Sequence, residues 1–100
     1  MKLEHFGMAE PGDCRVVFTA SAEELTAALA KEQDAPDAPQ DEEELLTEAV
    51  NRTILEGFDP LYRQLVQEQK LVPVTDPDFE LLAVNKAEGF RAGAQFYTLP

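Results

Sequence analysis

The chain has 100 residues, with one cysteine, 20 acidic and 8 basic side chains, and a formal net charge of −12 at pH 7. This length allows one domain with a single modest core, one cysteine excludes an internal disulfide framework, and no apolar run is long enough to cross a membrane. The negative charge argues against a nucleic acid or an anionic membrane as partner, so the composition favours a soluble cytoplasmic protein that binds another protein.

The first twenty residues predict an antiparallel hairpin. Residues 2–8 and 14–20 are two extended candidates, and Pro11 and Gly12 between them fit the second and third positions of a type II turn. Alternate residues of the second strand share one face, which we expect to point into the core; they are Cys14, Val16, Phe18 and Ala20.

A helix is predicted to follow, because Ser21 and Glu24 have the spacing of a capping box. It should end near Glu32 or Gln33. Residues 34–44 then contain six acidic side chains, two prolines and no basic side chain. Such a segment buries too little apolar surface to offset its ordering entropy, which predicts a mobile acidic loop. Its last four residues place negative charge on the first turn of the next helix, where the helix dipole favours it.

The longest apolar pattern of the chain lies between residues 46 and 66. Its members recur three or four positions apart and form one stripe on a helical rod; they are Leu46, Val50, Ile54, Phe58, Leu61, Tyr62, Leu65 and Val66. Gly57 and Pro60 interrupt the rod, and Asp59 can cap a new helix. The pattern therefore predicts two helices that meet at a bend, with Phe58 and Leu65 as core anchors.

The last third of the chain predicts a second hairpin. After an extended segment at 71–77, residues 78–86 and 90–99 alternate like paired strands around a turn at 87–89. Strand alternation puts Leu81 on the side of Phe79 and puts Leu82 and Val84 on the other side. A strand that is apolar on both sides is expected in the middle of a sheet. The elements together predict an α+β fold, an antiparallel sheet of about four strands with three helices packed on one face.

Catalytic and cofactor motifs are absent from the sequence. His5 and Cys14 could form a nucleophile pair across the first hairpin, but nothing supplies an orienting group or an oxyanion hole. Neither a metal-ligand spacing nor a phosphate-binding glycine loop occurs. The many carboxylates are more typical of a solvated acidic face than of an acid and base pair. We expect no enzyme activity and no cofactor.

The stretch LLTEAVNRTILEGFDPLYRQLVQEQKLVPVTDPDFEL combines a helix with an acidic start, a bend, a second helix and a VxPVxxPxFE-like exit. This order resembles the N-terminal, ribosome-binding domain of trigger factor, the bacterial nascent-chain chaperone. The first hairpin followed by TASAEELTAALAKE is similar to the same family. The resemblance implies a single domain over residues 1–100, which could begin a longer protein, and association with ribosomes and unfolded client chains.

One departure from the family changes this expectation. Trigger factor carries a ribosome-contacting GFRxGKxP signature between its first and second long helices, where this chain has DAPDAPQDEEE. A GFRAG string occurs at residues 89–93, but Ala94 and Phe96 replace the lysine and proline, so we interpret the string as coincidence. Ribosome docking is therefore expected to be weakened or lost.

An acidic protein–protein interaction domain is the alternative function. In that interpretation, the acidic loop engages a basic patch on another protein. The candidate partner-binding residues of the chain are Asp34, Asp37, Asp41, Glu42, Glu43 and Arg91.

Overall fold

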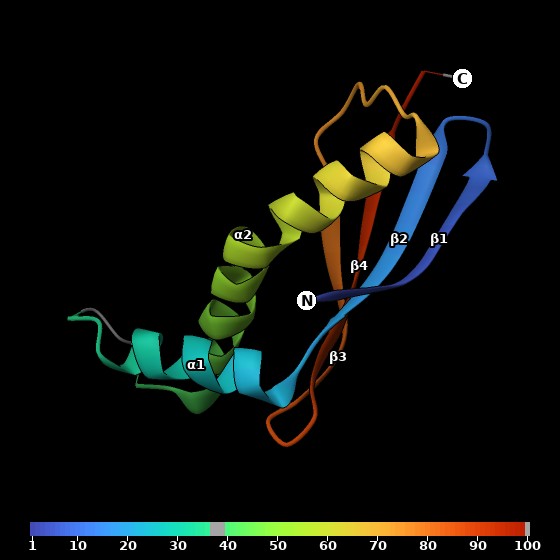
Figure 1. Ribbon diagram of the computed structural model, residues 1–100. Helices are drawn as coiled ribbons and strands as arrows, with labels where there is room; N and C mark the ends of the chain where they lie inside the picture. Colours follow the sequence, from blue (N-terminus) through green and yellow to red (C-terminus); the bar gives the residue numbers. More distant parts are fainter. Residues whose placement is uncertain (37–39, 100) are drawn as a thin grey trace.

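The computed structural model of the protein describes residues 1–36 and 40–99 (Figure 1). Its elements in chain order are β1 (Lys2–Glu10), β2 (Asp13–Ala20), α1 (Ala22–Gln33), α2 (Glu42–Gln69), β3 (Asp78–Asn85) and β4 (Gly89–Tyr97). The strands form one antiparallel sheet in the order β1-β2-β4-β3, with both helices on the same side of it (Figure 1). The predicted α+β class and four-stranded sheet are confirmed, but the described residues form two helices instead of three.

The first hairpin has the predicted turn. Pro11 and Gly12 connect the strands, and Gly12 has a φ of +84°, which a residue with a side chain rarely adopts. A Cβ atom at Gly12 would also lie 2.8 Å from the carbonyl oxygen of Thr98. Pairing extends closer to the turn than predicted, because Glu10 pairs with Asp13.

Helix α1 has the predicted capping box. The Glu24 amide donates to Ser21 Oγ at 3.1 Å, and the Ser21 amide donates to Glu24 Oε1 at 3.3 Å. The helix ends at Gln33, as predicted, with Asp34 as its C-cap residue. Two of its side chains, Leu25 and Ala28, are buried against the rest of the core.

Helix α2 is one helix of 28 residues, so the prediction of two separate helices was wrong. Pro60 lies inside it and cannot donate its backbone hydrogen bond, which bends a helix without necessarily ending it. Figure 1 shows the change of direction near the middle of α2. Asp59 does not cap a second helix; its side chain forms an ion pair with Arg63 at 2.9 Å instead. The apolar stripe continues through the bend, so both halves gain burial by packing on the same sheet.

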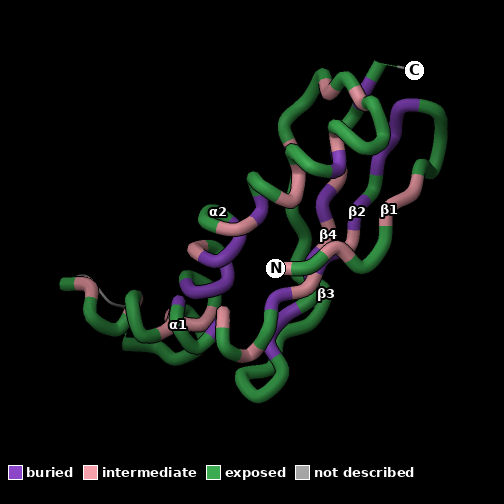
Figure 2. Tube along the Cα trace, in the orientation of Figure 1, coloured by how far each residue is buried: buried purple, intermediate pink, exposed green. Residues whose placement is uncertain are grey.

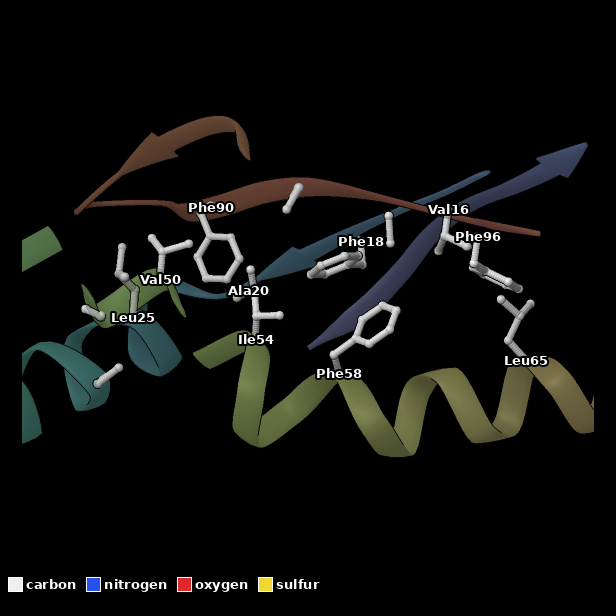
Figure 3. Close-up of a cluster of buried hydrophobic side chains, with 14 of the residues drawn as sticks. Val16, Phe18, Ala20, Leu25, Val50, Ile54, Phe58, Leu65, Phe90 and Phe96 are labelled. Carbon is white, nitrogen blue, oxygen red and sulfur yellow. The ribbon is translucent and has the colours of Figure 1, made fainter. Parts of the chain in front are cut away.

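The core lies between α2 and the two central strands (Figures 2 and 3). Its buried sheet residues belong to β2, namely Cys14, Val16, Phe18 and Ala20, and to β4, namely Phe90, Ala92, Ala94 and Phe96. Helix α2 contributes Ala49, Val50, Ile54, Phe58 and Leu65. Aromatic rings connect the layers, because the Phe58 ring lies 5.0 Å from that of Phe18 and Tyr62 lies 5.1 Å from Phe96. The predicted core face of β2 and both predicted helix anchors are confirmed.

Strand β3 is an edge strand, which corrects the prediction that it lies centrally. It pairs with β4 on one side, and no strand of the described chain pairs with its other side. A register irregularity between Leu81 and Ala83 also changes the predicted alternation. Val84 pairs with the buried Phe90 and so shares the helix-facing side with Phe79 and Leu81. Leu82 lies near Gly93, on the outer side of the sheet.

Replacing Phe58 or Leu65 by alanine should lower the free energy of unfolding by about 2 to 5 kcal/mol, because each change leaves a cavity in the core. Leu55→Ala on the same helix is the control, since Leu55 is 80% exposed, and it should cost less than about 1 kcal/mol. Urea denaturation followed by circular dichroism gives these values. Equal losses in the three variants would show that the stripe does not face the core.

The charged form of Asp13 should stabilise the fold at pH values above those at which its carboxylate titrates. It accepts hydrogen bonds from Gln95 Nε2 at 2.9 Å and Arg15 Nη2 at 3.3 Å. The Gln95 bond is the main reason that the pKa of Asp13 is lowered, and it outweighs the opposing effect of burial. Because the pKa is lower in the folded state than in the unfolded state, the charged carboxylate stabilises the fold at pH values above the unfolded-state pKa of about 3.9. This stabilisation is lost as the pH falls through the folded-state pKa.

Asp13→Asn should therefore make the urea midpoint decline less steeply as pH falls below about 5. Glu10→Gln removes one carboxylate from the same hairpin without removing these two hydrogen bonds, so it is the matched control. An identical pH dependence in wild type and Asp13→Asn would contradict the stabilising role of the charged form.

Candidate protein-binding site

The predicted acidic residues lie at the junction of α1 and α2. Asp34 caps the end of α1, and Asp41 caps the start of α2, where its carboxylate accepts the Glu43 amide at 3.0 Å. Residues 42–44 already belong to α2, so the loop predicted over residues 34–44 ends earlier than predicted. Asp37 lies outside the described residues. Negative charge at a helix N-terminus is favourable by itself, so Asp41 and the first-turn glutamates have a structural reason to be there.

Glu42 already has a partner within the chain. Its carboxylate forms an ion pair with Lys86, in the turn between β3 and β4. This contact connects the start of α2 to the second hairpin. Glu42 is therefore less available to an external basic patch than the sequence analysis expected.

Arg91 lies elsewhere, in the sheet. Its guanidinium is 2.6 Å from the Glu4 carboxylate on β1, and its neighbours Phe90 and Ala92 are buried. Gly89 has a φ of +99°, and a Cβ atom there would lie 2.0 Å from the Ala20 carbonyl oxygen. The GFRAG residues thus form the first part of strand β4. The structure does not bring Arg91 together with the acidic residues of the helix junction.

An exposed apolar strand edge is the surface that the sequence analysis missed. We call it the β3 edge and define it by Phe79, Leu81, Leu82 and Val84, which are 46%, 45%, 46% and 36% exposed. Figure 2 shows β3 exposed along its whole length. Apolar residues on both sides of a strand usually indicate a central strand, which explains the error. Asp78 and Glu80 were the signal for an edge, because charged side chains commonly protect edge strands from pairing.

The β3 edge is exposed because none of its residues belongs to the buried core beneath α2. The fully buried sheet residues all come from β2 and β4, and the partly buried residues that pack on them include none from β3. Phe79 makes the main connection, with its ring 4.9 Å from Phe58 and 6.3 Å from Phe18, both edge to face. One side of Phe79 is therefore attached to the core while the other side meets solvent.

Negative charge surrounds this edge. Asp76, Asp78, Glu80 and Glu88 are exposed, and the ion pairs found within residues 1–36 and 40–99 include none of them. Lys86 is close in sequence, but its charge is paired with Glu42. The result is an apolar strand with unpaired carboxylates at both ends.

The remaining features do not indicate catalysis. An open hollow of about 790 Å³ lies beside the β3–β4 turn, with Lys2, Glu24, Glu88 and Arg91 among its lining residues. The Ser21 hydroxyl in this hollow contacts the Glu24 carboxylate, but this pair is the capping box of α1. Within the described ranges, no three potential metal ligands are grouped together. None of the described helices is long and apolar enough to cross a membrane.

Comparisons with known proteins add no assignment: no protein-family model and no curated protein matches this chain. The resemblance to trigger factor therefore depends on the residues quoted for it. The β3 edge is the strongest candidate for a functional surface.

Proposed function

We propose that this chain is a trigger-factor-like, chaperone-related domain that binds unfolded or nascent client chains through the β3 edge, without enzyme activity. The observation that carries this proposal is the row of four apolar side chains, each more than a third exposed, on a strand with a free edge. Contiguous exposed apolar surface is a common mark of protein-binding sites. A cytoplasmic location suits such a role.

The order of elements supports the proposal. The chain forms a hairpin, a helix, an acidic connection, a bent long helix, an extended segment and a second hairpin. This is the order that the resemblance to the trigger factor domain implies.

Weakened or lost ribosome docking is part of the same proposal. The GFRAG string lies in β4, where Phe90 and Ala92 are buried and Arg91 is paired with Glu4. The connection between the two helices, where the family carries its signature, is acidic in this chain. A net charge of −12 adds repulsion from RNA phosphates.

Binding of a basic partner at the helix junction is the alternative. Glu43 and Glu44 are exposed at the start of α2, which favours it. However, Asp41 already caps the helix and Glu42 already pairs with Lys86, so these two residues have roles in the fold. The β3 edge offers apolar contact in addition to charge, and we therefore rank it first.

Client capture should depend on the β3 edge. We expect the domain to slow the aggregation of a chemically denatured enzyme after dilution, measured by light scattering. The double variant Leu81→Thr/Leu82→Thr keeps good strand formers but removes apolar contact worth about 1 kcal/mol per half-buried leucine, so roughly fivefold or more protein should be needed. Leu55→Thr, which removes an exposed leucine from α2, should act like wild type.

The unfolding temperature of each variant has to be measured with it, because a loss of folding would also abolish capture. Full capture by the folded double variant would contradict the assignment of the β3 edge. Loss of capture in Leu55→Thr to the same extent would point to a general effect of removing surface leucines.

Arg91→Ala should change ribosome affinity by less than about 0.5 kcal/mol in cosedimentation at low salt, because Arg91 is already paired with Glu4. Arg15→Ala, another exposed arginine of the sheet, is the matched control. A tenfold or larger loss specific to Arg91→Ala would show that the GFRAG strand is a docking element.

A further inference from the structure

The two edges of the sheet differ in how well they could accept another strand. An edge strand presents unpaired N–H and C=O groups at alternate residues. On β1, two register irregularities interrupt the ladder, and the apolar Leu3 and Phe6 are turned toward the core. On β3 there is one irregularity, and the apolar side chains remain exposed. The β3 edge is therefore the better template for an added strand.

The side chains of β3 would contact both faces of such a strand. Phe79, Leu81 and Val84 lie on the helix-facing side, while Leu82 lies on the outer side. Successive side chains of an added strand also point to alternate faces and pack beside their cross-strand neighbours. A partner with apolar residues at successive positions would thus bury apolar surface on both sides of the sheet.

The negative charges near β3 indicate which residues should lie on either side of the apolar part of the partner strand. Asp76 and Asp78 precede the apolar row, Glu80 lies between its first two members, and Glu88 lies beyond its end. Lysine or arginine residues on both sides of the apolar centre would meet these carboxylates. A second copy of this chain fits less well, because it would bring together two domains that each carry a net charge of −12.

We propose that the β3 edge binds an extended peptide segment by strand addition, as a fifth strand of the sheet, and that it selects an apolar centre with basic flanks. This inference rests on the proposed protein-binding function and specifies its geometry and its class of partner.

The test uses a short fluorescent peptide with two lysines at each end and valine and phenylalanine between them, with binding to the domain measured by fluorescence anisotropy. Two further peptides carry N-methyl groups on one or the other set of alternate central amides. In strand addition only one set faces β3, so one methylated peptide should bind about tenfold or more weakly and the other nearly normally. Binding through side chains alone gives no such difference.

The charge preference is tested with Asp78→Asn/Glu80→Gln. This variant should bind the basic peptide about threefold or more weakly at low salt, with the difference reduced at high salt. Glu10→Gln/Glu48→Gln removes the same charge from exposed positions of β1 and α2, outside β3, and it should bind as wild type does. A peptide with glutamates in place of its lysines should not bind.

Equal affinity for the two methylated peptides would overturn strand addition while leaving client capture intact. Equal binding by both charge variants would overturn the preference for basic flanks. A stable dimer that peptide cannot dissociate would overturn the choice of partner and assign the edge to a second copy. Failure of the aggregation assay is a separate result, because it would count against the proposed function itself.

Discussion

The packing of α2 across β2 and β4 determines most other features of this protein. Neighbouring strands lie about 4.8 Å apart and a helix with its side chains is about 10 Å wide, so one helix covers about two strands. Here β2 and β4 provide the eight buried apolar residues of the sheet, and Phe58 joins them through contact with Phe18. β1 turns Leu3 and Phe6 toward this core, whereas β3 adds no residue to the core and touches α2 through the Phe79 ring, which contacts Phe58. The exposed strand edge thus follows from the narrow helix layer.

The bend in α2 makes this packing possible along the whole length of the sheet. A sheet twists, so a straight helix would leave it toward one end. Figure 3 shows Ile54, Phe58 and Leu65 along α2, all directed toward the side chains of the sheet. Pro60 lies between Phe58 and Leu65, where the loss of one backbone hydrogen bond allows the two halves to differ in direction.

Local chemistry allowed much of the fold to be predicted from the sequence. The Pro11–Gly12 turn and the Ser21 capping box depend on residues that are close in sequence, so both could be located from the sequence alone. Two errors came from non-local energetics: packing on the sheet keeps α2 continuous through Pro60, and the width of the helix layer leaves β3 at an edge. Asp41, Glu42 and Glu43 were correctly predicted to lie at a helix N-terminus, but the pairing of Glu42 with Lys86 requires the folded chain. For the same reason the β3 edge could not be found from its alternation alone.

Hydrogen exchange of the backbone amides, with and without a bound client peptide, tests the central claim most directly. In the free protein, the outward-facing amides of β3 should exchange faster than the amides of β2, which is paired on both sides. Bound client should slow those β3 amides, while β1 and the junction of α1 and α2 should exchange as before. Protection at the start of α2 with no change in β3 would contradict the account and assign binding to the acidic helix junction.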